Sequence, residues 1–425
     1  MGMWRGLRVA FIVGSLFMIL LIIVYWDDVG GFNLYPLQDP KHNPLDYYSQ
    51  PETSPGSLHS LSTATVLPSS LLSLPTTGGS TPPIPEQLEV GSKAERYREK
   101  EREEKEGERR EEHEEEEGEW RHAEERRQEE RKQSIVSVCS GEGSVEFPGK
   151  TRTFDQIPNR ELDHLIVDDT HQIIYCYVPK VACTNWKRVM VVLSQSLVSP
   201  SSGKPYTDPE AVPPDLVHNS SLHLTFAKFW RHYGSLSRHL MALKLQHYTK
   251  FLFVRDPFVR LISAFRNKFG RPNEDFYRQF GSVMLHRYGN LSGSLPETAA
   301  QAFAAGIKPS FQQFITYLLD PETEKDATFN EHWRQVYRLC HPCQVQYDFI
   351  GKLETLETDS EQLLRILGVD HLLHFPTGAR NRTAASWERD WFAGIPIEMR
   401  RELYKLYEPD FELFGYPKPD SVLHR

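Results

Sequence analysis

The stretch Tyr177-Val-Pro-Lys-Val-Ala-Cys-Thr-Asn-Trp186 joins a strand-like run, residues 171–178, to a helical period. The residues that mark the helix lie on one face at helical spacing: Trp186, Val189, Met190, Leu193 and Leu197. A strand that turns directly into a helix presents unpaired N–H groups and the positive end of the helix dipole, which suits a bound anion. Lys180 and Thr184 lie in this turn, where they could neutralise a phosphate group and donate to it.

A second stretch, Phe253-Val-Arg-Asp-Pro-Phe-Val-Arg-Leu-Ile-Ser263, has the same design. Asp256 suits the N-cap and Pro257 the first helical position. The apolar residues behind them again repeat at helical spacing: Phe258, Leu261, Ile262, Phe265 and Phe269. Arg255 leaves the strand at its carboxyl end, and Ser263 follows about two helical turns later. A guanidinium fork and a hydroxyl group suit a second phosphate.

Short β-like runs alternate with helical periods through the C-terminal part of the chain. This alternation predicts an α/β domain with a central, largely parallel sheet and flanking helices. Each anion loop by itself could be an ordinary turn between a strand and a helix. Two such loops at one sheet edge fit a ligand with phosphates at both ends of a nucleoside. A nucleotide kinase or GTPase is disfavoured because the Gly-x-x-x-x-Gly-Lys-Ser/Thr pattern is absent.

The charge of the chain is unevenly distributed. The formal net charge is −9, of which residues 1–92 contribute −4 and residues 93–132 contribute −5. The remaining 293 residues carry 33 basic and 33 acidic side chains. A neutral domain of this kind disfavours a general nucleic-acid binder, so no nucleic-acid partner is expected.

Composition also divides the chain into four segments. Residues 1–8 are expected to form a cytoplasmic tail, and the uncharged run 9–26 is just long enough to span a bilayer. The basic residues before this run and the acidic residues after it place the rest of the chain in the lumen. A cleaved signal peptide is the alternative. Residues 27–134 read as a stem, first rich in Pro, Ser and Thr and then highly charged, before a catalytic domain at 135–425.

Cysteine and asparagine patterns agree with a lumenal domain. The chain has five cysteines, so an oxidising compartment leaves at least one unpaired within the chain. Cys340 and Cys343 lack a second cysteine pair for zinc, which favours a local or longer-range disulfide. Three N-glycosylation sequons begin at Asn219, Asn290 and Asn381.

The two anion loops resemble the 5′-phosphosulfate loop and the 3′-phosphate segment of carbohydrate sulfotransferases, in the group of the chondroitin 4-O-, dermatan 4-O- and HNK-1 enzymes. Further similar stretches are 223–229, 329–334, 339–343 and 347–354. The resemblance implies the sulfotransferase fold, similar to that of P-loop nucleotide kinases, with 3′-phosphoadenosine 5′-phosphosulfate as donor and no metal. The donor-binding residues it implies are Pro179, Lys180, Val181, Ala182, Cys183, Thr184, Asn185, Arg255, Asp256, Pro257, Phe258, Val259, Arg260, Leu261, Ile262 and Ser263.

The resemblance further implies transfer of a sulfuryl group to the 4-hydroxyl of N-acetylgalactosamine in chondroitin or dermatan, by a single-pass type II protein of the Golgi membrane. Another lumenal glycan, modified at O3 of glucuronate or on an N-glycan, is an alternative acceptor. A noncatalytic glycan-binding module is a further alternative. Basic side chains available to such a polyanion are Lys187, Arg188, Arg231, Arg238, Arg266, Lys268, Arg380 and Arg382.

The acceptor hydroxyl requires a general base, and histidine is the side chain best matched to near-neutral pH. His223 lies between the two anion loops, where related sulfotransferases carry their base. It is therefore expected to be catalytic, together with Lys180, which would meet the charge on the leaving phosphate. His218 and His332 remain alternatives to His223. The sequon at Asn219 requires any glycan there to point away from the acceptor.

Overall fold

The structure is a computed structural model that describes residues 88–141, 145–289, 293–325, 327–377 and 387–424. The expected membrane span at 9–26 and the sequons at Asn290 and Asn381 lie outside these residues, as do Arg380 and Arg382. Within the described part of the chain, no helix combines the length and the apolar character that a bilayer crossing requires. The anchor therefore stays a prediction.

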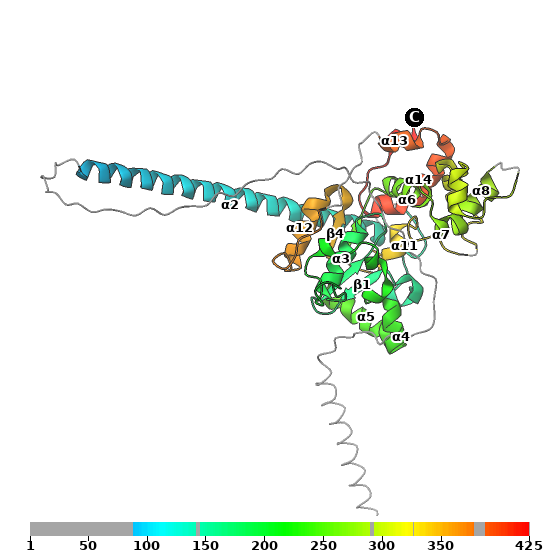
Figure 1. Cartoon of the computed structure of the whole chain (residues 1–425), viewed down its shortest axis with the longest axis horizontal. Helices are drawn as coiled ribbons and strands as arrows, with labels where there is room; N and C mark the ends of the chain where they lie inside the picture. The colour runs from blue at the N-terminus through cyan, green and yellow to red at the C-terminus, as the bar shows by residue number, and fades with distance from the viewer. Residues whose placement is uncertain (1–87, 142–144, 290–292, 326, 378–386, 425) are drawn as a thin grey trace, which may run out of the picture. The chain divides into compact units, whose positions relative to one another are not determined.

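Four strands form one sheet in the order β1-β2-β3-β4. Their bounds are β1 Leu165–Asp168, β2 Ile173–Cys176, β3 Thr249–Val254 and β4 Phe349–Lys352. β1 pairs with β2 antiparallel, whereas β2, β3 and β4 are parallel neighbours. Helices flank the sheet (Figure 1), so the expected α/β architecture with a largely parallel sheet is confirmed.

The two expected strand–loop–helix units are both present. In the first, β2 leads into α3, Cys183–Leu193, which ends before Leu197. In the second, β3 leads into α6, Pro257–Phe269, and the Asp256 carboxylate accepts from the N–H groups of Phe258 and Val259 at 2.9 Å. The remaining helices are α2 Leu88–Ser140, α4 Phe226–Tyr233, α5 Leu236–His247, α7 Glu274–Phe276, α8 Ser282–Tyr288, α9 Ala299–Ala304, α10 Phe311–Leu319, α11 Val336–Cys340, α12 Leu356–Ile366, α13 Trp387–Phe392, α14 Ile397–Leu413 and α15 Asp420–Leu423.

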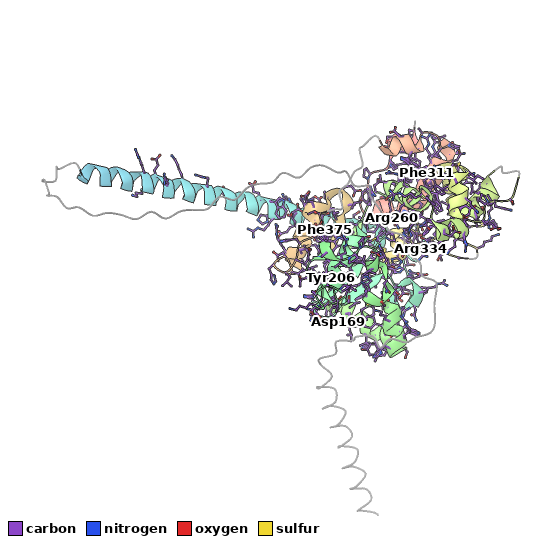
Figure 2. All side chains as sticks on the ribbon, viewed as in Figure 1. Asp169, Tyr206, Arg260, Phe311, Arg334 and Phe375 are labelled. Atoms are coloured by element: carbon purple, nitrogen blue, oxygen red, sulfur yellow. A yellow bond between two sulfur atoms is a disulfide. The ribbon has the colours of Figure 1, made fainter. Side chains whose placement is uncertain are left out.

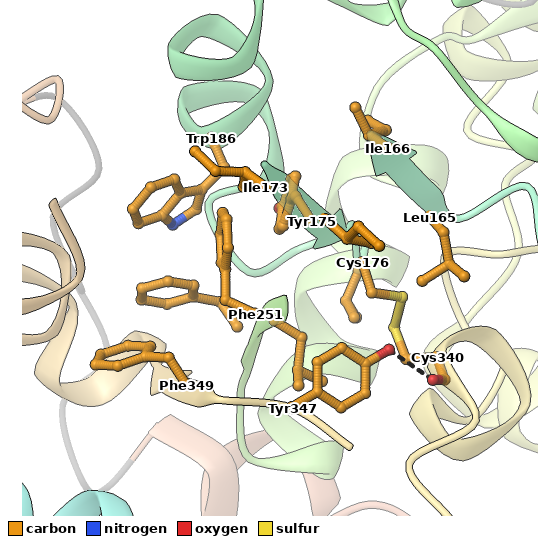
Figure 3. Packing of buried hydrophobic residues seen from close by; sticks show 14 of the residues in the cluster. Leu165, Ile166, Ile173, Tyr175, Cys176, Trp186, Phe251, Cys340, Tyr347 and Phe349 are labelled. Atoms are coloured by element: carbon orange, nitrogen blue, oxygen red, sulfur yellow. Dashed lines mark hydrogen bonds between the residues drawn. A yellow bond between two sulfur atoms is a disulfide. The ribbon is translucent and has the colours of Figure 1, made fainter. Parts of the chain in front are cut away.

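Aromatic rings from α3 and the three parallel strands fill the core beside the sheet (Figure 3). The rings of Tyr175 and Phe251 stack at 4.8 Å, and Trp186 lies 4.9 Å from Phe251, between centroids. β4 has Gly351 where it faces this cluster, since a Cβ there would lie 2.2 Å from a ring carbon of Phe253. This packing joins α3 to the three parallel strands beneath it.

The charged segment forms the single helix α2, and the domain begins within it. Gln128 exchanges hydrogen bonds with both backbone groups of Ile350 in β4, at 3.0 and 3.2 Å. Arg131 donates to the Ile350 carbonyl at 2.7 Å and to the Asp359 carboxylate at 2.8 Å. These contacts precede the expected domain boundary at residue 135, so the packed domain includes the last turns of the charged segment.

Two disulfides join distant parts of the domain. Cys139 at the end of α2 pairs with Cys343, and Cys176 at the end of β2 pairs with Cys340 (Figure 3). The longer-range alternative is thus confirmed for both Cys340 and Cys343. Cys183 remains as a free thiol, as the odd cysteine count requires.

The docking of α2 predicts a large difference between two adjacent basic residues. Arg131→Met leaves the fully buried Asp359 carboxylate without its cationic partner, so the free energy of unfolding is expected to fall by about 3 kcal/mol. Lys132→Met removes only an exposed pair with Glu129 and is expected to change it by less than about 0.5 kcal/mol. Denaturant unfolding of both variants measures this. Equal stabilities would contradict the inclusion of α2 in the domain.

Candidate active site

The loop between β2 and α3 has a strained backbone. Lys180 and Ala182 adopt the left-handed conformation, with φ of 73° and 62°, at a cost of about 1–2 kcal/mol each. Ala182 occupies the N-cap position and has no side chain that could cap the helix. The first N–H groups of α3 therefore keep their capacity to bind an anion. Lys180 Nζ donates to Asn267 Oδ1 of α6 at 2.5 Å, which joins this loop to the second unit.

Cationic side chains gather around this loop. Burial, followed by the charge of Lys180, lowers the pKa of Lys268 to about 7. Burial also lowers the pKa of Lys187, whose ammonium lies 3.7 Å from the centroid of the Tyr177 ring. A buried cation whose charged form is disfavoured is stabilised when an anion binds beside it. The electrostatics therefore fit a phosphate or sulfate group at the first loop.

Glu331 is an acidic residue whose charge acts on several cations of this cluster. Its charge raises the pKa of Lys187 and of Lys268, against the effect of burial. Its carboxylate accepts from the Tyr177 hydroxyl at 3.2 Å and lies 3.6 Å from His164 Nε2. Sequence reasoning did not single out Glu331. The available signal was its position within the family-like stretch 329–334.

The three candidate histidines differ in burial and in hydrogen-bond partner, although the charges of Lys180 and Lys268 act on His332 as they do on His218. His223 is 3% exposed, and its Nε2–H donates to the Val217 carbonyl at 2.6 Å. Burial lowers its pKa to about 3. His332 is 5% exposed, its Nδ1–H donates to Asn330 Oδ1 at 2.7 Å, and burial lowers its pKa well below the usual value. Both rings are thus embedded in the protein.

His218 is the histidine that contacts the first loop. Its Nε2 is hydrogen-bonded to Thr184 Oγ1 at 3.1 Å, and the ring is half-buried. Burial, followed by the charge of Lys187, lowers its pKa to about 4. The geometry therefore favours His218 over the expected His223 as the residue beside the reacting group. The next residue, Asn219, is exposed, and its side chain accepts from the Ser221 N–H at 2.9 Å.

Arg255 and Ser263 are half-buried in the second unit. Burial lowers the pKa of Arg255, while the nearby Glu354 and Asp256 oppose that shift. Burial raises the pKa of Asp256 to about 6, and Glu354 accepts from the Asp256 N–H at 3.1 Å. Asp256 caps α6 and so orients the loop, whereas Arg255 and Ser263 are the side chains with chemistry suited to a phosphate.

Arg260 differs from the expectation that it contacts the donor. The residue is 1% exposed, and its guanidinium donates to three backbone carbonyls: Pro179 at 3.0 Å, Arg334 at 2.7 Å and Glu331 at 2.9 Å. Figure 2 labels Arg260 beside Arg334. These bonds are directed within the protein, so the side chain supports the first loop from behind.

Other expected donor-binding residues lie at or beneath the loops. The side chains that are buried, and that leave only backbone groups for a ligand, are Pro179, Val181, Pro257, Phe258, Leu261 and Ile262. Asn185 is also buried, and its amide donates to the Pro376 carbonyl at 3.2 Å. Cys183 and Val259 are half-buried. The structure thus brings the two predicted segments together. Some of their side chains are accessible to a ligand, whereas others are buried and hold the loops in place.

A cavity of about 970 Å³ opens beside the second loop. Glu354, which bonds the Asp256 backbone, lines it together with Phe375, whose ring packs 4.7 Å from that of Trp186. Its charged lining is mainly acidic, with Glu357, Glu361 and Asp370 against Arg365. The donor's phosphate groups therefore fit the two loops better than this cavity. Among the described residues, no set of three or more His, Cys, Asp or Glu side chains is placed to hold a metal ion.

Comparisons with known proteins agree with this geometry. The sulfotransferase family model matches residues 163–417. Carbohydrate sulfotransferase 12 of Xenopus laevis is 53% identical over 422 residues, which cover 97% of each chain. The mouse protein of that name is 65% identical over 291 residues, 68% of this chain and 69% of its own. Carbohydrate sulfotransferase 11 of Rattus norvegicus is 42% identical over 62% of this chain and 70% of its own.

No solved structure gives a significant match. The family expected from the two loops is confirmed by the model match and by these relatives. The chain therefore belongs to the sulfotransferase family.

Proposed function

We propose that this chain transfers the sulfuryl group of 3′-phosphoadenosine 5′-phosphosulfate to the 4-hydroxyl of N-acetylgalactosamine in chondroitin, with desulfated dermatan as a further acceptor. The observation that carries the proposal is the cationic cluster at the start of α3. There the charge of Lys180 contributes to the lowered pKa values of Lys268 and His218. The relatives' names, which specify carbohydrate sulfotransferases, support a carbohydrate acceptor.

The residues of the two loops fit the donor. The N–H groups at the start of α3, Lys180 and Thr184 would hold the 5′-phosphosulfate, and Arg255 with Ser263 would hold the 3′-phosphate. The donor supplies an activated sulfuryl group whose departure leaves negative charge on a phosphate oxygen. The ammonium of Lys180 meets that charge, and Lys268 adds to the positive potential once an anion raises its pKa. The remaining contribution of the protein is to position the two substrates.

In the proposed reaction the acceptor oxygen forms a bond to sulfur as the bond between sulfur and the phosphate oxygen breaks. The proton of the acceptor hydroxyl must pass to a base. We assign this role to His218, because it is half-buried and hydrogen-bonded to Thr184 of the donor loop. The lowered pKa of His218 keeps its imidazole neutral, and so able to accept a proton, at pH 6 to 7.

The acceptor and the location are proposed from observations other than the donor loops. The donor loops do not discriminate among sugar hydroxyls, so O3 of glucuronate and N-glycan N-acetylgalactosamine remain alternative acceptors, and a glycan-binding protein without activity is a further one. Two disulfides support an oxidising compartment. The exposed Asn219 is compatible with a glycan. Both agree with a lumenal domain of a single-pass Golgi membrane protein.

Loss of either proposed phosphate contact should remove transfer without unfolding the protein. Lys180→Ala and Arg255→Ala are each expected to lower kcat/KM at least about 100-fold, because each removes the positive charge that would face a bound phosphate or the charge developing on the leaving group. Lys204→Ala, which removes an exposed lysine elsewhere, should leave kcat/KM unchanged. Labelled-sulfate transfer and circular dichroism of the full chain measure the two properties. Normal transfer by a folded Lys180→Ala protein would remove the donor assignment.

Substitution of the two neighbouring histidines should separate catalysis from folding. His218→Ala is expected to lower kcat about 10² to 10⁴-fold with donor saturating. His223→Ala leaves the Val217 carbonyl without its donor, so it should reduce the free energy of unfolding by about 1–3 kcal/mol and largely preserve kcat.

The pH profile provides a second readout for His218. Because its pKa is lowered to about 4, the wild-type kcat/KM should hold its value down to pH 6 and decline only as pH falls further. Normal turnover by His218→Ala would return the role to His223 or His332. A decline centred at about 6.5, the ordinary histidine value, would contradict the assignment to His218, and it would fit neither His223 nor His332, whose pKa values burial also lowers.

A further inference from the structure

The helices α4 and α5 carry a surface whose charge differs from that of the rest of the domain. Between Asp215 and Asp256 the sequence contains six Lys or Arg residues and five His residues but no Asp or Glu. The middle of this stretch folds into α4 and α5, which pack against each other (Figure 1). The basic residues on α4 and α5 themselves are Lys228, Arg231, Arg238 and Lys244, and neither helix carries an acidic residue that would offset them.

The same two helices expose large apolar side chains. Trp230 and Tyr233 of α4 are each 42% exposed. Leu236 and Leu243 of α5 are 51% and 39% exposed, and His239 between them is exposed on the same helical face. Apolar groups of this size, grouped beside basic residues, are typical of a binding surface.

Helices α4 and α5 form a helical hairpin, and some of its basic residues already have acidic or carbonyl partners. Arg238 donates to Asn159 and to the Phe154 carbonyl, and Lys244 pairs with Asp169, the residue that follows β1. Asp163 accepts from the Ala227 N–H and lies within electrostatic range of Arg231. The exposed basic groups that remain toward solvent are Arg231, His232, His239 and His247. They and the exposed rings define what we call the hairpin surface.

The hairpin surface is connected to the candidate active site through a short segment. His218 contacts the donor loop, and the chain reaches α4 eight residues later. Lys228 of α4 donates to the Ser221 carbonyl at 2.5 Å and contributes to the lowered pKa of His223. A long acceptor bound beside His218 can therefore continue onto α4.

We infer that the hairpin surface binds the anionic polysaccharide acceptor at sugar units beyond the one that reacts. Carboxylate and sulfate groups complement the Arg231 guanidinium and accept hydrogen bonds from the N–H groups of the exposed histidines, and the apolar C–H faces of sugar rings pack on Trp230 and Tyr233. An anionic lipid surface would share part of this chemistry, but it would not require continuity with His218. The inference rests on the proposed function. It adds that the affinity for the acceptor depends on the length of the polysaccharide.

The test compares a short and a long acceptor with the full chain purified in detergent. Trp230→Ala/Arg231→Ala should raise the KM for polymeric chondroitin about tenfold, from the loss of a screened ion pair and a packed ring. The KM for a chondroitin tetrasaccharide and the kcat for both acceptors should stay within about twofold. Arg231→Ala/His239→Ala, which removes no ring, should show the same selectivity. The matched control is Lys308→Ala/Lys405→Ala, two exposed lysines outside the hairpin.

A second measurement is independent of catalysis. On immobilised chondroitin without donor, the hairpin variants should elute at lower salt than the wild type, and the control should not. Equal elution and equal KM for the polymer would overturn the inference. A difference seen only on phosphatidylserine-containing vesicles would also overturn it, in favour of a lipid surface. If the wild type transfers sulfate to neither acceptor, the proposed function fails, while the elution experiment still decides whether the hairpin binds the polysaccharide.

Discussion

The guanidinium of Arg260 donates to the backbone carbonyls of Pro179, Glu331 and Arg334, and so joins three segments that are far apart in the sequence. Charge-assisted bonds of this kind contribute about 1.5–3 kcal/mol each. They hold the strained loop that presents Lys180 and place Glu331 behind it. The second strand–loop–helix unit thus supports the first, and neither loop is an independent anion site.

Local patterns were sufficient to predict much of this arrangement. The N-cap Asp256, the helix α6 and the parallel strands follow from residue types and spacing within about 15 residues, where short-range interactions dominate. The roles of Arg260 and His223 could not be predicted in the same way. Whether an arginine or a histidine reaches a ligand or a backbone carbonyl depends on long-range packing, and here both are buried.

Two further features depended on contacts that sequence spacing does not encode. The charged segment forms a helix, as its residue pairs allow, but only the docking of Arg131 on Asp359 shows that the domain includes its end. The cysteines predicted some disulfide, whereas the pairing of Cys176 with Cys340 follows from the position of β2 beside the end of α11. The distribution of charge in the fold could not be predicted either. The net charge of the domain is zero, but its cationic side chains gather around the first loop and on the hairpin of α4 and α5.

The central claim is that this gathered positive charge serves transfer of a sulfuryl group to a sugar hydroxyl. Incubation of the full chain with donor labelled in its sulfate, in the presence of desulfated chondroitin, desulfated dermatan or a glucuronate-terminated oligosaccharide, tests it most directly. Disaccharide analysis of the products should locate the label as an ester on O4 of N-acetylgalactosamine. Label on glucuronate would contradict the proposed acceptor, and no label in any carbohydrate although the chain binds the donor would contradict the central claim itself.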